Sequence, residues 1–352
     1  MSKNPVLYKT LVVGVIVLFI CMSITPSVAI DNPIKPISSG NTLYVGGSGE
    51  GNYTKIQDAI NDASDGDTVF VYDDSSPYQE LLGIKKSINL IGENRDTTIL
   101  YLSSIWIEAD AVKVSGFTFQ DKPLYITPII INESDYCEIS NNFFKDGFRC
   151  AIILQESAHY NKIINNKFVN CGYDYDEYDS VISLVYNSSF NLIANNKIID
   201  SLVQGIRLFF SSDNIITGNT LINISYGIVL EYSSKNNISF NDIFESHSPS
   251  LYIIGFSNRN VIYRNRFYSS ELHSIVLGGS YFNKVLENSF INTSLLFCVE
   301  NSGGLFTRWD GNFWVRPRTI PKVIPVIFHF QIPPFWFQFD WHPAKEPYDI
   351  DV

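Results

Sequence analysis

Acidic residues and tyrosines alternate in one short stretch of the chain, CGYDYDEYDS, which covers residues 171–180. Its acids are Asp174, Asp176, Glu177 and Asp179, and its tyrosines are Tyr173, Tyr175 and Tyr178. Carboxylates accept sugar hydroxyls or hold Ca²⁺, and tyrosine rings offer flat apolar faces to sugar rings. The spacing is not that of an EF-hand, which needs a glycine at the sixth position of its loop. We therefore take residues 173–179 as a candidate binding loop, with a solvated acidic loop as the alternative.

Ligands for copper are scarce and scattered in this sequence. Copper sites in exported proteins draw on Met, His and Cys side chains. The only methionines are Met1 and Met22, and the histidines, which show no short-range pairing, are His159, His247, His273, His329 and His342. We expect no strong copper site, and we expect His342 to be packed in a C-terminal cap.

The cysteines that follow the N-terminal segment are Cys137, Cys150, Cys171 and Cys298, and they form no CxxC motif. Two interpretations stay open. Cys150 and Cys171 fall in successive repeats and could form a disulfide in an oxidising compartment, or all four thiols are buried singly.

The elements that carry these residues follow a repeat. Segments such as NIITGNTL (214–221) and NVIYRNRF (260–267) alternate asparagines with aliphatic residues. Repeat lengths in the twenties indicate stacked supersecondary units. The second asparagines recur every 22 to 24 residues, with one interval of 30 that contains the acidic loop, at Asn142, Asn166, Asn196, Asn219, Asn241, Asn265 and Asn288.

Each repeat is too short for two helices and shows the two-residue periodicity of strands. Ile206 and Leu208, for example, flank Arg207. Three short strands joined by bends make one coil of a parallel β-helix, so we predict an all-β, right-handed parallel β-helix of about ten coils. Asparagine tolerates the left-handed conformation of tight bends, and stacked amides bond to one another. The asparagine column is therefore expected to be a structural ladder.

Both ends of the predicted solenoid carry a cover. Residues 54–66 predict an amphipathic helix with a capping box at Thr54 and Gln57 and a stop at Gly66. The face that would cover the first coil consists of Ile56, Ala59, Ile60 and Ala63. The first coil is expected to open with a strand at 67–72. After Gly304 the chain is rich in proline and aromatic residues, which predicts a C-terminal cap.

The N-terminal segment predicts export. Lys3 and Lys9 precede an apolar run at residues 11–22, and small residues at 27–29 fit a cleavage site. The expected organisation is a signal peptide at 1–29, an extension and capping helix at 30–66, coils at 67–304 and the cap at 305–352. An uncleaved anchor is the alternative, and only then would the chain contact a membrane. A secreted or cell-surface location is therefore expected.

Composition narrows the class of partner. The net charge of −11 at pH 7 argues against nucleic acid, because phosphate binding needs clustered Lys and Arg. It is compatible with cations and with neutral glycans. Candidate N-glycosylation triplets, which give weak support for export, begin at Asn52, Asn132, Asn187, Asn223, Asn237 and Asn292.

These segments carry a family resemblance. The stretch from Tyr53 to Leu100, the NxIxxN repeats and the ending GNFW…FDWHPAKEPYDI resemble exported archaeal β-helix proteins, which are grouped with the periplasmic copper-binding (NosD-type) repeat proteins. The resemblance covers roughly residue 41 to the C-terminus and implies a pectate-lyase-like solenoid. Similar repeats serve carbohydrate-binding proteins, polysaccharide lyases and hydrolases, and a copper-maturation accessory factor. In pectate-lyase-like members, substrate lies across the outward side chains of one stacked strand.

The outward positions of the repeats test that implication. Counting back from each column asparagine gives one outward column of Leu154, Leu184, Arg207, Val229, Ile253 and Val276. The next outward column is Glu156, Tyr186, Phe209, Glu231, Gly255 and Gly278. Its two acids are three rows apart, about 14 Å at strand spacing, which is too far to act on one glycosidic bond. Arg207 and Glu231 remain candidates for ligand binding, and no catalytic residues are predicted.

We therefore expect a non-catalytic, exported cell-surface protein that recognises a glycan or a neighbouring surface protein. A polysaccharide lyase, hydrolase or epimerase is the alternative, and copper delivery is the third interpretation. Ca²⁺ is the cofactor that the acidic loop could hold, whereas copper is not expected despite the family resemblance.

Overall fold

The computed structural model describes residues 40–120, 126–172, 179–270, 273–293, 298–326 and 336–350. The chain divides into two compact units, residues Met1–Ser38 and Ser39–Val352. The first unit, which includes the predicted signal segment, lies outside the described residues. None of the helices in the described ranges is long and apolar enough to cross a membrane.

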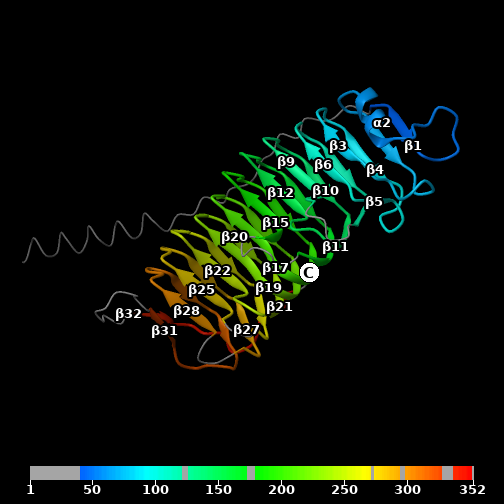
Figure 1. Cartoon of the computed structure of the whole chain (residues 1–352). Coiled ribbons are helices and arrows are strands. Elements are labelled where there is room, and N and C mark those ends of the chain that lie inside the picture. Colours follow the sequence, from blue (N-terminus) through cyan, green and yellow to red (C-terminus); the bar gives the residue numbers. More distant parts are fainter. Residues whose placement is uncertain are drawn as a thin grey trace, which may run out of the picture. The chain divides into compact units, whose positions relative to one another are not determined.

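The second unit is a parallel β-helix, as the repeat predicted (Figure 1). Its first face is one ladder of parallel strands. The ladder begins with β1 and continues with one strand from each of eleven successive coils, the last being β29. These strands are β1 (Thr42–Val45), β2 (Thr68–Val71), β4 (Asn89–Gly92), β7 (Lys113–Ser115), β10 (Glu138–Ser140), β13 (Lys162–Ile164), β16 (Leu192–Ala194), β18 (Ile215–Thr217), β20 (Asn237–Ser239), β23 (Val261–Tyr263), β26 (Lys284–Leu286) and β29 (Arg308–Asp310). The solenoid therefore opens with β1, one strand earlier than the predicted strand at 67–72.

The second and third faces belong to one 18-stranded sheet. The second face contains β5 (Ile99–Tyr101), β8 (Thr118–Gln120), β11 (Phe143–Gly147), β14 (Lys167–Cys171), β17 (Lys197–Phe209), β19 (Thr220–Glu231), β21 (Asp242–Ser246), β24 (Arg266–Tyr268), β27 (Ser289–Ile291) and β30 (Phe313–Trp314). The third contains β3 (Leu81–Ile84), β6 (Ser104–Ile107), β9 (Ile129–Asn132), β12 (Ile152–Gln155), β15 (Ser180–Val185), β22 (Leu251–Ile254), β25 (Ile275–Gly278) and β28 (Val299–Ser302). The long strands β17 and β19 join both faces, because their first halves pair with β14 and β21 and their second halves with β15 and β22.

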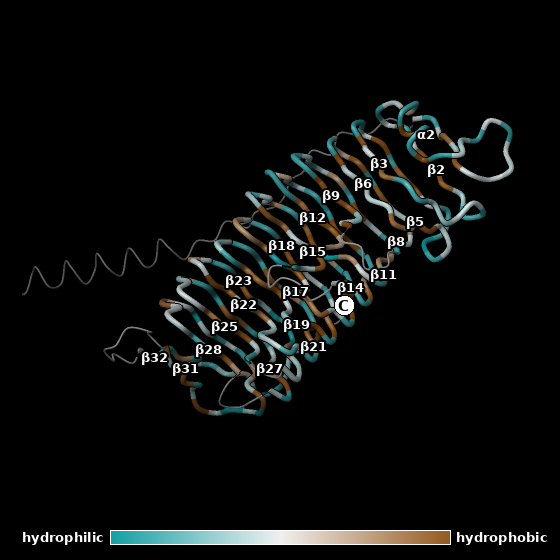
Figure 2. The backbone as a smooth tube through the Cα atoms, viewed as in Figure 1, coloured by the Kyte–Doolittle hydropathy of each residue, from teal (hydrophilic) through white to brown (hydrophobic). Residues whose placement is uncertain are grey.

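The core runs along the inside of the coils. Buried residues alternate with more exposed ones on most strands, and apolar residues recur along the coils in Figure 2. Aromatic side chains at one interior position stack from coil to coil. The ring centroids of Phe119 and Phe144 are 4.7 Å apart, and those of Phe144 and Phe168 are 4.8 Å apart. Parallel in-register strands force equivalent residues into columns, so each repeat supports its neighbours.

The predicted cover of the first coil is present as α2 (Ile56–Asp62). Ile56, Ala59 and Ile60 are buried, as expected for the apolar face. The predicted capping box is wrong, because no side chain of the N-cap residue Lys55 bonds to the helix. Glu80, from the following coil, instead accepts hydrogen bonds from the backbone N–H groups of Ile56 (2.8 Å) and Gln57 (3.0 Å). The helix also ends at Asp62, before Gly66.

The column asparagines form a continuous hydrogen-bonded chain at the corner between the first and second faces. Each Nδ2 donates to Oδ1 of the asparagine in the next coil, at 2.9 to 3.2 Å, from Asn142 through Asn288 to Asn312. Each backbone N–H donates to the same oxygen, as Asn219 does to Asn241 at 3.0 Å. These side chains are all buried.

The left-handed conformation, however, does not belong to these asparagines. It belongs to the residues just before them, and those residues are Asn141, Asn165, Asn195, Gly218, Phe240, Arg264 and Glu287. The conformational reason predicted for the column is therefore wrong, and hydrogen bonding is the reason that the structure gives. The first asparagines of the repeats form a second buried chain, in which Asn214, for example, donates its N–H to Oδ1 of Asn236 at 2.8 Å.

A hairpin covers the other end. β32 (Trp336–Asp340) pairs with β29 in parallel and with β31 (Lys322–Val326) in antiparallel orientation. Asp340 takes the place of the next asparagine, since its Oδ2 accepts bonds from the backbone N–H and the Nδ2 of Asn312 at 2.9 and 3.0 Å. Trp314 Nε1 donates to the same oxygen at 2.9 Å. The asparagine ladder thus ends in a buried carboxylate.

Candidate functional site

The strand pairings correct the predicted outward columns. Ser183, Arg207, Val229 and Tyr252 are in register, followed by Val276 and Glu300. Leu154, Leu184 and Ile253, which counting placed in this column, are fully buried core residues. The second column likewise contains Gln155, Val185 and Ile254 in place of Glu156, Tyr186 and Gly255. Counting failed by one residue because the turns between outward strand and asparagine differ in length.

Arg207 and Glu231 do meet, but in a closed arrangement. Arg207 Nη2 donates to Glu231 Oε2 at 3.1 Å, and the guanidinium lies 4.6 Å from the centroid of the Phe209 ring. Only 7% of Arg207 is exposed. The guanidinium is buried and already contacts a carboxylate of β19 and an aromatic face of β17. It offers little surface to a ligand.

Most of the acidic candidate loop lies outside the described residues, namely Tyr173, Asp174, Tyr175, Asp176, Glu177 and Tyr178. Asp179 is described and does not project from the coil. It is buried, its Oδ1 accepts a bond from Arg149 Nε at 2.6 Å, and its carbonyl oxygen accepts one from the Gln204 N–H. Asp179 therefore belongs to the coil, and its predicted place in a solvent-exposed loop is wrong.

The candidate glycosylation residues all reach the surface at least in part. Asn187, Asn237 and Asn292 are exposed, and Asn52, Asn132 and Asn223 are half-buried.

The described residues do not fit a copper centre. Cys137, Cys150, Cys171 and Cys298 are buried free thiols, and burial raises the pKa of Cys137 and of Cys150 to about 12. The described part of the chain contains no group of three or more His, Cys, Asp or Glu side chains able to hold a metal ion. Copper needs deprotonated thiols or clustered imidazoles.

A cavity opens in the C-terminal cap, where the sequence predicted only packing. It has a volume of about 370 Å³. Its lining comes from β29, β32 and their flanks, and consists of Thr307, Arg308, Trp309, Asp310, Gln338, Phe339, Trp341 and His342. His342 is not packed as predicted, since 82% of its side chain is exposed.

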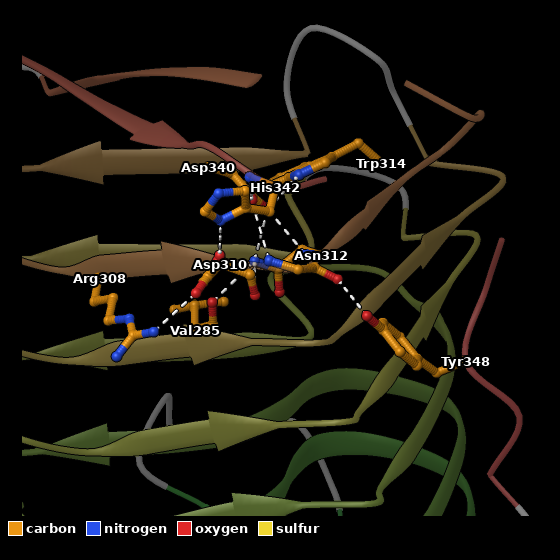
Figure 3. A network of polar contacts seen from close by, with 9 residues as sticks. Val285, Arg308, Asp310, Asn312, Trp314, Asp340, His342 and Tyr348 are labelled. Atoms are coloured by element: carbon orange, nitrogen blue, oxygen red, sulfur yellow. Dashed lines mark hydrogen bonds and ion pairs between the residues drawn. The ribbon is translucent and has the colours of Figure 1, made fainter. Parts of the chain in front are cut away.

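Three ionisable side chains meet at this cavity (Figure 3). Asp310 Oδ2 accepts a bond from Arg308 Nη2 at 2.8 Å, and Asp310 Oδ1 lies 2.9 Å from His342 Nδ1. Arg308 beside it, helped by His342, holds the pKa of the Asp310 carboxyl below its ordinary value of 3.8. Asp310 is therefore ionised at neutral pH. With Nδ1–H directed at Asp310, the Nε2 atom of His342 is left as the second polar atom of the ring.

An aromatic side chain stands next to these groups. Trp341 is 61% exposed, and its ring centroid lies 4.9 Å from that of Phe339 in a stacked arrangement. Asp340 fixes this segment, because its Oδ1 accepts bonds from the N–H groups of Gly311 (3.1 Å) and His342 (3.2 Å). An exposed indole can pack against the apolar face of a sugar ring, and neighbouring charged groups can hydrogen-bond to the hydroxyls of the sugar.

Comparison with known proteins places the fold. A family model described as periplasmic copper-binding protein (NosD) matches residues 176–319. The solved structure of the PL6 family alginate lyase AlyGC superposes with a TM-score of 0.54 at 14% identity, covering 77% of this chain and 43% of that one. The chain is a parallel β-helix repeat protein. The predicted pectate-lyase-like fold class is thereby confirmed.

Two further solved structures are similar. The Dettilon tailspike protein has a TM-score of 0.55 at 15% identity, covering 71% of this chain and 54% of that one. The catalytic domain of a GH87 α-1,3-glucanase, solved with nigerose, has a TM-score of 0.57 at 12% identity, covering 82% and 60%. The chain thus spans less than two thirds of the length of each of these three proteins. No protein with a curated description matches this sequence.

Proposed function

We propose that this protein is an extracytoplasmic, non-catalytic β-helix protein that binds a glycan in the pocket of its C-terminal cap. The observation that carries the proposal is the exposed Trp341 ring beside the ionised Asp310, with Arg308 and His342 on the same carboxylate. The match of residues 176–319 to a family described as periplasmic supports a location outside the cytoplasm.

The charges of the pocket indicate the class of glycan. Arg308 is already paired with Asp310, so the pocket carries little unbalanced charge to attract a polyanion. Asp310 accepts sugar hydroxyls, and the outer imidazole nitrogen of His342 offers one more hydrogen bond. We therefore expect a neutral saccharide whose ring lies on Trp341.

The test is a glycan array, run with and without Ca²⁺, on protein purified from cells that express the full chain. Trp341→Ala should weaken binding to the best glycan by about tenfold or more, equivalent to about 1.4 kcal/mol. Trp106→Ala is the matched control, because Trp106 is a partly exposed tryptophan on β6 near the other end of the solenoid. Unchanged affinity of Trp341→Ala for a bound glycan would place the binding site elsewhere.

Polysaccharide cleavage is the second candidate, and one observation favours it. His342 is held by a carboxylate through Nδ1, an arrangement that orients an imidazole for proton transfer through Nε2. Incubation of the protein with the glycans that bind best, followed by analysis of chain length, separates the two functions. Shortened chains that disappear in His342→Gln would identify an enzyme, and intact chains support binding alone.

Copper delivery remains the third interpretation, which the description of the matched family brings. The described residues do not support it, because their thiols are buried and their His, Cys, Asp and Glu side chains form no cluster able to hold a metal ion.

A further inference from the structure

One corner of the solenoid carries an exposed ridge that the glycan pocket does not involve. It lies in the turns from the third face to the first, and most of its outer residues come directly before the first asparagine of a repeat. Its outer column, in which every residue has a positive φ, follows Ala111 and consists of Tyr136, Tyr160, Phe190, Asp213, Lys235, Arg259, Phe282 and Phe306. An inner column at the start of the same turns adds Tyr186, Phe210 and Tyr232, and the next turn adds Phe256, which directly follows the level residue Gly255. We call these residues the turn ridge.

The rings of the turn ridge stack on one another along the solenoid. Tyr136 and Tyr160 are 5.2 Å apart with an interplanar angle of 7°, and Tyr160 and Phe190 are 5.3 Å apart at 12°. Phe210 and Tyr232 are 4.6 Å apart at 6°. Stacked rings cover each other's faces, so the ridge presents mainly ring edges. Sugar platforms need an open ring face, and a row of edges is better suited to pack against another protein surface.

The turn ridge is large enough for a stable interface. Eight of its aromatic side chains are 38% to 63% exposed. At about 150–250 Å² for each aromatic residue, they offer on the order of 800 Å². A standard interface takes about 800 Å² from each partner, whereas the largest apolar patch on a monomer is usually about 300–600 Å².

The order of residues in the outer column is consistent with a second copy of this chain as the partner. Along the chain the column has three aromatic residues, one acid, two bases and two aromatic residues. If a second copy of the column runs in the opposite direction, with the two copies centred between Asp213 and Lys235, each residue faces a residue of compatible chemistry. A two-fold axis at that point sets Asp213 against Lys235 of a second copy, and Phe190 against its Arg259. It sets the remaining aromatic residues against one another. Phe210 and Tyr232 of the inner column also exchange places.

Charge supports this pairing. Within the described part of the chain, Asp213, Lys235 and Arg259 form no ion pair, whereas other outward charges do, as Arg264 does with Glu287 of the next coil. The antiparallel arrangement supplies each with an opposite charge or an aromatic face and brings no like charges together. Contact of one surface with its own copy is the isologous geometry of cyclic dimers.

We propose that the turn ridge is the interface of an antiparallel homodimer of this chain. The proposal does not depend on the glycan pocket, which lies in the C-terminal cap. Its centre is the pair of contacts between Asp213 of one copy and Lys235 of the other, and its flanks are aromatic.

Sedimentation velocity over a range of micromolar concentrations tests it, on protein purified from cells that express the full chain. We expect a monomer–dimer equilibrium. Asp213→Lys and Lys235→Asp should each raise the dissociation constant at least tenfold, because each brings like charges together twice. The double variant Asp213→Lys/Lys235→Asp restores both opposite-charge contacts and should recover dimerisation. Lys345→Asp, at an exposed position in the C-terminal cap, is the control and should change nothing.

Circular dichroism of every variant separates loss of folding from loss of association. Phe282→Ser, remote from the axis, should also weaken the dimer. A chain that stays monomeric throughout, single variants that dimerise normally, or a double variant that does not recover would each overturn the proposal. Open-ended assemblies would also overturn it, since an isologous contact closes after two copies.

Discussion

At the scale of single residues, the repeated asparagines satisfy the backbone at a corner that strand pairing leaves incomplete. Asn219 accepts two bonds from Asn196 and donates to the carbonyl oxygen of Ile193 and to Asn241. Buried backbone groups need such partners. A side chain with both a carbonyl and an amide group can do this in every coil, which no aliphatic residue of similar size can.

Replacing Asn219 with Leu should therefore destabilise the protein. The change leaves the backbone N–H and the amide of Asn196 without their acceptor, and we expect a loss of about 1–3 kcal/mol in the free energy of unfolding for each buried group orphaned. Chemical denaturation measures it. Asn195→Gly is the control, because Asn195 is exposed and left-handed, and Gly218 stands at the equivalent position one coil later. Equal stability of parent and Asn219→Leu would contradict the role of the ladder.

At the scale of elements, residues from a neighbouring coil complete the ends of helix α2 and strand β15. Glu80 caps α2, and Arg149 holds Asp179 at the start of β15. Asp179 is part of the coil, because its carbonyl oxygen accepts a hydrogen bond from the backbone N–H of Gln204 in the next coil. The insertion in the 30-residue repeat therefore ends before Asp179. Only residues 173–178 can be regarded as additional to the coil.

Deleting residues 173–178 should leave the solenoid folded, because Asp179 and its ladder bond remain. If these residues bind glycan or Ca²⁺, the deletion variant will keep the circular dichroism spectrum of the parent and bind cell-envelope polysaccharide more weakly. A second variant that also removes Asp179 serves as the comparison and should unfold at a lower temperature. A folded 173–178 deletion with normal binding would show that the loop takes no part in recognition.

At the scale of the whole molecule, the solenoid needs ends that do not stack with other chains. α2 covers the first coil, and the hairpin of β31 and β32 covers the last. Asp340 joins this cover to the ladder through five N–H donors, from Gly311, Asn312, Trp314 and His342. A carboxylate fits because it accepts bonds through both oxygens and has no hydrogen of its own to place.

Asp340→Asn should loosen the cover while keeping its shape. One oxygen becomes an NH₂ group that faces backbone donors, and hydrogen bonds to a charged group are replaced by neutral ones. We expect a loss of about 2–4 kcal/mol and assemblies larger than a dimer, formed through the loosened end. Thermal unfolding and light scattering report the two effects. Glu346→Gln, at an exposed position of the same cap, should alter neither.

The repeat, the parallel β-helix and the covers at both ends could be predicted from the sequence. The reason is that in-register stacking requires the same residue type at each coil, so the spacing of the asparagines and the two-residue periodicity are visible in one dimension. The apolar face of α2 could also be predicted, because Ile56, Ala59 and Ile60 follow the period of a helix.

The sequence did not show which outward residues are level with one another, what caps α2, or where a pocket opens. Turns of unequal length shift the register by one residue, which moved Leu154 and Leu184 from the predicted surface into the core. The cap residue Glu80 and the pocket group His342 act on segments 24 and 32 residues away. Such contacts follow from how coils stack and how the hairpin folds back on them, and no local pattern in the chain records them.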